Sequence, residues 1–155
     1  LAQDKTKMFE VLNSEIPKID PLPELVLLLQ PTVPFRKKNH IRMAINLLSS
    51  QFDSLISVET VPDKYSPNQM IVMTPSGPRM ASGGPIYARV NGRENYSKAY
   101  IPDGSIYLFR TKNLEKGNFY GEKTLLMETR GEINIDNSED WQTAESYVKN
   151  LAKTE

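Results

Sequence analysis

The strongest constraint on the fold is a run of five aliphatic residues, Leu25–Leu29, bounded by Pro23 and Pro31. A run this short, closed by proline, predicts a β-strand. Because every position is apolar, we expect the strand to be buried on both faces, as in a parallel sheet covered by helices. A helical segment near Asn39 and a second apolar strand, Ser54–Val58, follow. Strand, helix and strand in this order form a βαβ unit, which predicts an α/β fold.

The later part of the chain changes in character. Residues 62–98 are rich in proline, glycine, serine and asparagine, which predicts a surface loop or a hairpin arm turning at Thr74–Gly77. Regular structure is expected again at Ser105–Phe109 and Thr124–Met127. We expect one domain over residues 1–155.

A final helix is predicted after Asp136. Asn137 or Ser138 would cap it, and the acidic residues that follow suit its positive end. Its apolar stripe, expected to be buried, consists of Trp141, Ala144, Val148 and Leu151.

Composition excludes several classes of function. Nineteen basic residues balance nineteen acidic ones, so no net charge attracts nucleic acid or an anionic membrane surface. The chain has no cysteine, which excludes disulfides and thiolate metal sites. No apolar run is long enough to cross a bilayer, and we expect a cytoplasmic protein. The single histidine, His40, is expected at the surface near a helix start.

Three segments fall where ligands bind in open α/β sheets, beyond the carboxyl ends of strands. In the first, Gln30–Arg36, prolines fix the backbone so that Gln30 and Thr32 can be held in place, and Arg36 offers a forked donor for carboxylate or phosphate. The alternative is a rigid strand-to-helix turn.

The second segment, Tyr100–Tyr107, contains the turn dipeptide Asp103-Gly104. The third is Glu132–Asp136. If it is a strand, Asn134 and Asp136 face the same side, and their oxygens suit Mg²⁺. The alternative is that Asp136 only caps the final helix.

At these segments the sequence resembles the N-acylneuraminate cytidylyltransferases, or CMP-sialic acid synthetases. Leu28–Arg36 (LLQPTVPFR) is similar to the family's L-L-Q-P-T-S-P-x-R block. Tyr100–Tyr107 (YIPDGSIY) resembles its Y-x-x-N-G-A-I-Y block. Ile133–Glu145 resembles its acidic ending, D-I-D-x-x-x-D-[WF]-x-x-A-E. The resemblance covers nearly the whole chain in the same order and spacing.

The resemblance implies a nucleotide-diphospho-sugar transferase-like (Rossmann-like) α/β fold, a homodimer and a protruding dimerisation arm, for which residues 62–98 are the candidate. It also implies a Mg²⁺-dependent reaction. The anomeric hydroxyl of a nonulosonic, sialic-type acid attacks the α-phosphorus of CTP, giving the CMP-sugar and pyrophosphate.

Residue by residue, the resemblance implies that Gln30, Arg93, Asp103 and Tyr107 contact the sugar acid. Thr32 and Arg36 share the glutamine block and are also expected to bind substrate. Asp136 matches a catalytic metal-binding aspartate, with Asn134 beside it.

The sequence departs from the family at two of these positions. Asn134 stands where the family has a second aspartate, which predicts weaker metal binding. Asp103 replaces an asparagine, and its negative charge repels an acidic sugar unless Arg93 or the metal offsets it. These changes are compatible with a variant substrate, such as a legionaminic or pseudaminic acid, or with loss of function.

The resemblance places the triphosphate-binding loop of the family in a first strand-and-loop segment that this sequence does not contain. We therefore expect the fold to lack that strand and its helix, and the chain alone to be inactive with CTP. Two other hypotheses stay open. One is CMP activation of a shorter 2-keto-3-deoxy sugar acid, and the other is a non-catalytic sugar-binding or dimerising module.

Overall fold

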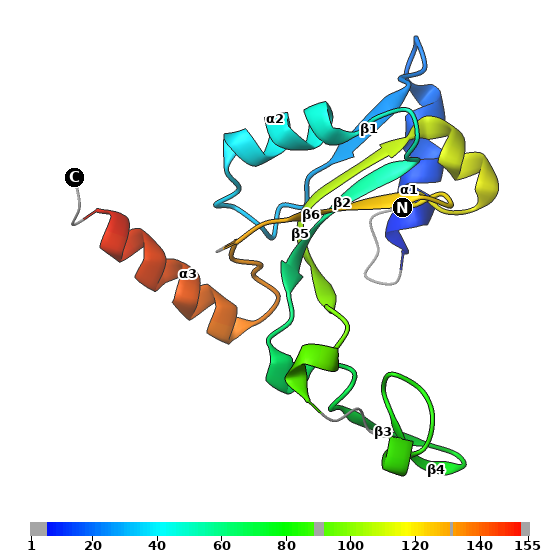
Figure 1. Cartoon of the computed structure of the whole chain (residues 1–155). Coiled ribbons are helices and arrows are strands. Elements are labelled where there is room, and N and C mark those ends of the chain that lie inside the picture. Colours follow the sequence, from blue (N-terminus) through cyan, green and yellow to red (C-terminus); the bar gives the residue numbers. More distant parts are fainter. Residues whose placement is uncertain (1–5, 89–91, 131, 153–155) are drawn as a thin grey trace. The chain divides into compact units, whose positions relative to one another are not determined.

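The computed structural model describes residues 6–88, 92–130 and 132–152. The chain divides into two compact units, Leu1–Val58 with Pro102–Glu155, and Glu59–Ile101 (Figure 1). The larger unit holds α1 (Met8–Glu15), β1 (Leu25–Leu28), α2 (Lys38–Leu47), most of β2 (Ser54–Thr60), most of β5 (Tyr100–Arg110), β6 (Thr124–Glu128) and α3 (Ser138–Leu151). Short 3-10 helices, η1 (Ile16–Lys18) and η5 (Thr111–Lys116), follow α1 and β5.

The four strands of the larger unit form one mixed sheet in the order β1-β5-β2-β6. β1 is antiparallel to β5, and β2 is parallel to β6. The N–H of Arg110, at the end of β5, donates to the Asp53 carbonyl just before β2 (3.1 Å), and the N–H of Val61, just after β2, donates to the Ala99 carbonyl just before β5 (2.9 Å). These two contacts show that β5 and β2 are antiparallel. The predicted strands are present, but the wholly parallel sheet is wrong, because β5 lies between the two strands of the βαβ unit. The local apolar pattern carries no information on which strands become neighbours.

Each face of the sheet has its own core. On one face, buried residues of α2 pack with those of three strands: Ala44, Leu48, Leu55, Ile106, Leu108 and Met127. On the other, α1, η1 and η5 cover Phe109: the cluster is Leu12, Ile16, Phe109 and Leu114. β1 contributes Leu27 to the first cluster and Val26 and Leu28 to the second. The predicted strand is confirmed and packs on both faces, but its predicted burial is wrong, because Leu25 is 36% exposed and the other three residues are only partly buried.

The final helix, α3, begins as predicted. The Asn137 side chain accepts hydrogen bonds from the N–H groups of Glu139 (2.8 Å) and Asp140 (3.0 Å), and Asp140 accepts from the Asn137 N–H (3.1 Å), which forms a capping box.

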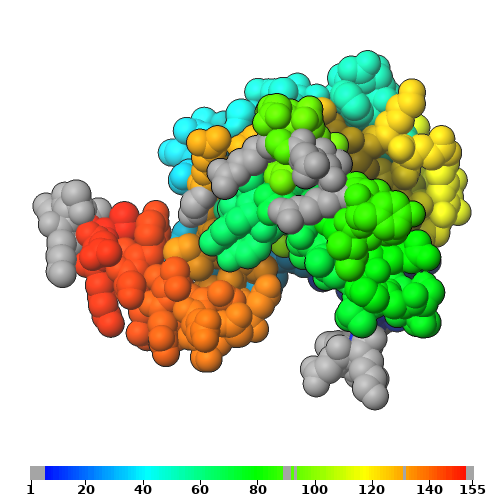
Figure 2. Space-filling model, turned by 60° about the horizontal axis from the view of Figure 1, so that its bottom comes forward, coloured from blue at the N-terminus to red at the C-terminus, as the bar shows by residue number. Residues whose placement is uncertain are grey.

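The expected buried stripe of α3 is wrong at most positions. Ala144 is buried, but Trp141 is 58% exposed, and Val148 and Leu151 are about half exposed. Figure 2 shows α3, in orange and red, open to solvent over most of its visible face. The amphipathic pattern is present in the sequence, but among the described residues few side chains pack on the apolar face of α3.

The smaller unit, residues 59–101, contains η2 (Asp63–Tyr65), η3 (Ile86–Ala88), η4 (Arg93–Asn95) and a hairpin. The hairpin strands, β3 (Ile71–Thr74) and β4 (Gly77–Met80), turn at the predicted place. None of the described helices is both long and apolar enough to cross a membrane.

Candidate functional site

The loop after β1 is held against β5 by Arg36. Its Nε donates to the Ser105 carbonyl (2.6 Å) and its Nη2 to the Gln30 carbonyl (2.8 Å). Burial lowers the pKa of Arg36, while the charges of Glu132 and Asp103 oppose that shift. Arg36 therefore fixes the loop after β1 to β5. Its predicted contact with a substrate stays a prediction.

The three segments singled out in the sequence meet around Gly104. Gly104 has a φ of +75°, and a Cβ placed there would lie 2.9 Å from Oε1 of Gln30 and 3.5 Å from Nδ2 of Asn134. Val33 Cγ2 would also lie 3.5 Å away. The left-handed backbone and the close side chains both favour glycine at this position. The side chains of Gln30 and Asn134 thus converge on Gly104, which lies inside β5. The predicted turn at Asp103-Gly104 is wrong, because both residues belong to one continuous strand.

A backbone hydrogen bond joins the first and third segments directly. The N–H of Ile135 donates to the carbonyl of Thr32 (2.8 Å). The Thr32 side chain is partly exposed beside this contact. The loop after β1 and the segment before α3 are therefore fixed relative to each other.

Asp103 is buried, and both oxygens of its carboxylate are used within the protein. Oδ1 accepts hydrogen bonds from the Ser57 hydroxyl and from the Ser105 N–H (2.8 Å), and Oδ2 accepts from the Thr129 hydroxyl. The side chain is only 8% exposed. These contacts allow Asp103 to hold Ser57, Ser105 and Thr129 in place, and its predicted contact with the sugar acid stays a prediction.

Tyr107 lies on β5, opposite Leu28 of β1. Its ring is half-buried and meets Phe119 edge-on, with 5.9 Å between ring centroids. Burial raises the pKa of Tyr107, and the charges of Asp103 and Asp136 add to the rise. The phenol stays protonated at neutral pH and can donate a hydrogen bond.

Asn134 and Asp136 lie side by side, although their segment is irregular rather than a strand. Asn134 Nδ2 donates to Asp136 Oδ2 (2.7 Å), and Oδ1 of Asn134 is buried without a hydrogen-bond partner. Asp136 is exposed and does not cap α3, because Asn137 holds that position. The helix-cap alternative for Asp136 is therefore wrong.

The pair can supply two oxygen ligands. In the described parts of the chain, no three His, Cys, Asp or Glu side chains gather into a metal site. Mg²⁺ commonly takes only one or two carboxylates and completes its shell with phosphate and water. Asp136 offers an exposed carboxylate, and Asn134 has an unused carbonyl oxygen, so these residues fit a weak Mg²⁺ site.

Arg93 lies in η4 of the smaller unit. The Arg93 side chain lies outside the described part of the chain, and the two units are not placed relative to each other. Its predicted contact with the sugar acid stays a prediction.

One close pair beside these segments was not predicted from the sequence. His40 Nδ1 lies 2.9 Å from Oε1 of Glu132, and the Glu132 side chain is fully buried. The expectation that His40 is a surface residue is wrong, since its side chain is 17% exposed. The two residues are far apart in sequence, so no local pattern could have joined them.

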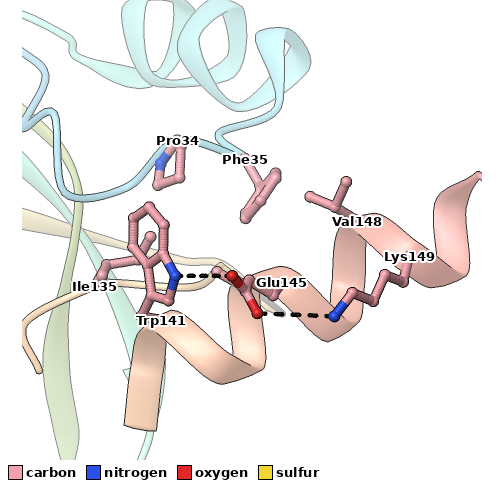
Figure 3. A pocket seen from close by; sticks show the side chains of 8 residues that line it. Pro34, Phe35, Ile135, Trp141, Glu145, Val148 and Lys149 are labelled. Atoms are coloured by element: carbon pink, nitrogen blue, oxygen red, sulfur yellow. Dashed lines mark hydrogen bonds and ion pairs between the residues drawn. The ribbon is translucent and has the colours of Figure 1, made fainter. Parts of the chain in front are cut away.

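An apolar pocket of about 390 Å³ lies between the loop after β1 and α3 (Figure 3). It is lined by Pro34, Phe35, Ile135, Trp141, Ala144, Glu145, Val148 and Lys149. The Trp141 indole N–H donates to Oε1 of Glu145 (3.1 Å), and Lys149 lies 3.8 Å from Oε2 of Glu145. Phe35 and Ile135 connect the pocket to the first and third segments.

Comparison with known proteins finds relatives among the cytidylyltransferases. The chain is 33% identical over 132 residues to the CMP-N,N'-diacetyllegionaminic acid synthase of Legionella pneumophila, covering 80% of this chain and 53% of that protein. It is 28% identical over 147 residues to the N-acylneuraminate cytidylyltransferase of Escherichia coli, covering 93% of this chain and 34% of that protein. The chain is a distant homologue of the CMP-sialic acid and CMP-legionaminic acid synthases.

A solved structure shares the fold of this chain. A solved structure of 4-diphosphocytidyl-2C-methyl-D-erythritol synthase from Anaerococcus prevotii superposes with a TM-score of 0.63 at 17% identity, covering 93% of this chain and 65% of that one. No protein-family model matches the chain. The synthase homologue spans about half the length of its Legionella relative and a third of its Escherichia coli relative.

Proposed function

We propose that this chain carries the part of a cytidylyltransferase that binds the sugar acid and the metal ion. The full reaction joins the CMP of CTP to the anomeric hydroxyl of a nonulosonic acid and releases pyrophosphate. The observation that carries the proposal is the meeting of Gln30 and Asn134 at Gly104, which brings the predicted segments to one end of the sheet.

The polar groups around Gly104 suit an acidic, hydroxyl-rich sugar. The Gln30 amide can donate to a carboxylate and accept from a hydroxyl, and the Tyr107 phenol can donate. Thr32 adds a hydroxyl in the same loop. Asp103 accepts a hydrogen bond from the Ser105 N–H on the other side of Gly104, while Arg36 fixes the loop after β1 and places a positive charge near it. In nucleotidyl transfer, positioning and charge neutralisation do most of the work, so a protein nucleophile is not required.

Asp136 would hold Mg²⁺, with Asn134 as a neutral second ligand. When bound, the ion neutralises phosphate charge and assists departure of pyrophosphate. Asn134 must turn its amide to present its oxygen, since its nitrogen now donates to Asp136. Replacing Asn134 with Asp should tighten Mg²⁺ binding at least tenfold, and Asp136→Ala should abolish it, as measured by calorimetry.

The smaller unit is proposed as a dimerisation arm. Its hairpin exposes apolar side chains: Met73 is 78% exposed and Ile71 56%, and Tyr87 nearby is 91% exposed. Exposed apolar side chains gathered in one small unit are typical of a protein interface. Met73→Glu should convert a dimer to a monomer in sedimentation equilibrium, whereas the control Ile45→Glu, on exposed α2, should not.

The second candidate is a non-catalytic sugar-binding module. It is favoured by the direct hydrogen bond between Asn134 and Asp136, which satisfies Asp136 without a metal ion. Pyrophosphate release separates the two candidates when a longer form of the protein that includes a triphosphate-binding loop is given CTP, Mg²⁺ and a panel of sugar acids. The panel should contain sialic, legionaminic and shorter 2-keto-3-deoxy acids, so that it also tests the choice of sugar.

The chain itself provides the most direct test of sugar binding. We expect a nonulosonic acid to bind to it in NMR titrations, and Gln30→Ala to weaken binding about tenfold, as loss of a hydrogen bond to a charged group of about 1.5–3 kcal/mol requires. Gln51→Ala is the matched control, because Gln51 is exposed and precedes β2 at the opposite end of the sheet. Equal affinities for the Gln30 variant and the parent would contradict the proposed site.

A further inference from the structure

The segment that carries Asn134 and Asp136 has few contacts that hold it to the sheet. Residues 132–136 form neither a helix nor a strand, and neither core cluster includes a described residue of this segment or of α3. The hydrogen bond from Ile135 to Thr32 joins the segment to the loop after β1, but that loop is irregular too. A further contact with a regular element is therefore needed to fix Asn134 beside Gly104.

Glu132, at the start of the segment, makes such a contact with α2. Its side chain is fully buried, and its Oε1 lies 2.9 Å from Nδ1 of His40 in the first turn of α2. α2 is fixed to the sheet by Ala44, which is completely buried in the first core cluster. Glu132 thus links the segment to an element that belongs to the core.

The contact between Glu132 and His40 is close, but it is not an aligned hydrogen bond. Within the described residues, neither carboxylate oxygen of Glu132 and no hydrogen on Nδ1 of His40 has a hydrogen-bond partner. The charge of Arg36 also acts on Glu132, and a negative charge is favoured near the first turn of a helix. A buried carboxylate held mainly by nearby charge contributes little to stability. Groups of this kind call for another explanation, which functional sites often supply.

We propose that Glu132 is a positioning residue for the sugar-acid site. Through its contact with His40, it holds Asn134 beside Gly104, and it does not itself touch the substrate. Asp136 is held by the same contact, because Nδ2 of Asn134 donates to its carboxylate (2.7 Å). The inference rests on the proposed function.

NMR can detect this arrangement in the chain without any ligand. Nδ2 of Asn134 lies 3.5 Å from the Cβ position of Gly104, so a nuclear Overhauser effect (NOE) is expected between the Asn134 side-chain amide and the Gly104 Hα protons. Glu132→Ala should remove this NOE. It should also weaken sugar-acid binding by about three- to tenfold, the cost of ordering one side chain, because Gln30 loses its neighbour at Gly104.

The conservative variant Glu132→Gln should rescue both properties. Its side chain has the same length, and its amide can donate to Nδ1 of His40. We expect the NOE to be present and the sugar-acid affinity to lie within about twofold of the parent, less than the cost of freeing one side chain.

Leu12→Ala is the control for a general loss of stability. It leaves a cavity in the core cluster on the opposite face of the sheet, so it should lower the urea midpoint but keep the NOE between Asn134 and Gly104. If Glu132→Ala does not fold, the partner position gives the same comparison. His40→Ala should lose the NOE, whereas His40→Gln, which can donate to Glu132, should keep it.

An NOE that persists in Glu132→Ala, or in His40→Ala where the first variant does not fold, would overturn the proposal. Its absence from the parent would do the same, and so would its loss in Leu12→Ala, because general instability would then explain the effect. The NOE is measured without sugar acid, so its result is independent of the test of the proposed function. A parent chain that shows the expected NOEs but binds no sugar acid would contradict the proposed function alone.

Discussion

Replacement of Asp103 tests how the candidate site is built. Its carboxylate accepts hydrogen bonds from Ser57, Ser105 and Thr129 in a buried position. In Asp103→Ala these three donors lose their acceptor together. The Ser57 hydroxyl can turn to the Ile106 carbonyl, 3.3 Å away, which leaves two donors without an acceptor.

The expected magnitude follows from those two donors. Each buried donor left unsatisfied costs about 1–3 kcal/mol, so Asp103→Ala should lower the free energy of unfolding by about 3 kcal/mol. Asp103→Asn should cost only about 1 kcal/mol, because the hydroxyl of Thr129 can rotate and accept from the new amide.

Urea unfolding followed by circular dichroism is the appropriate assay, because the single tryptophan, Trp141, is exposed on α3 and reports poorly on the sheet. With a slope of about 1–3 kcal/mol per molar urea, Asp103→Ala should move the midpoint down by 1 M or more. Thr129→Val completes a double-mutant cycle with Asp103→Asn, and a coupling of about 1 kcal/mol is expected for residues in contact. If the urea midpoint of Asp103→Ala lies within about 0.3 M of the parent, the carboxylate does not organise this part of β5.

The other predictions concern Gly104, the helix cap and a surface carboxylate. Gly104→Ala should lower the free energy of unfolding by about 1–3 kcal/mol, because alanine is strained at this positive φ. It should also weaken sugar-acid binding, because the added methyl group displaces Gln30, and an unchanged affinity would contradict this. Asn137→Ala should cost about 1 kcal/mol in thermal unfolding, since it removes the cap of α3, and an unchanged melting temperature would contradict this. The pKa of Asp53 is lowered by two backbone N–H groups that donate to its carboxylate. The contribution of the Asp53 carboxylate to the free energy of unfolding is therefore complete above its pKa in the unfolded chain, about 3.9, and is lost as pH falls through its pKa in the folded protein. The difference in free energy of unfolding between the parent and Asp53→Asn should therefore disappear as pH falls below about 4.

Local patterns in the sequence predicted the elements well and their neighbours poorly. The apolar run of β1, the turn at Thr74–Gly77 and the cap at Asn137 all depend on contiguous residues, and each is confirmed. The position of β5 between β1 and β2 depends on contacts between distant segments, which apolar periodicity does not encode.

The same distinction holds within the site. Spacing and resemblance singled out Gln30 and Asn134, and the structure brings both to Gly104. The pairing of His40 with Glu132 joins residues from opposite halves of the chain, and neither carries a local signal. The exposure of the α3 stripe was also beyond the sequence, because an amphipathic pattern gives the direction of a helix face and not what lies against it.

Ser57 links β2 to the part of β5 that contains Gly104. Its hydroxyl accepts a hydrogen bond from the Ile106 N–H (2.7 Å) and donates to the carboxylate of Asp103, the residue before Gly104. The positive φ of Gly104 inside a strand is an irregularity of the kind that re-aims neighbouring residues and is common near functional sites. Ser57→Ala removes both hydrogen bonds and should therefore perturb sugar-acid binding as well as stability. An effect on stability alone would show that the Ser57 contacts support the sheet and not the site.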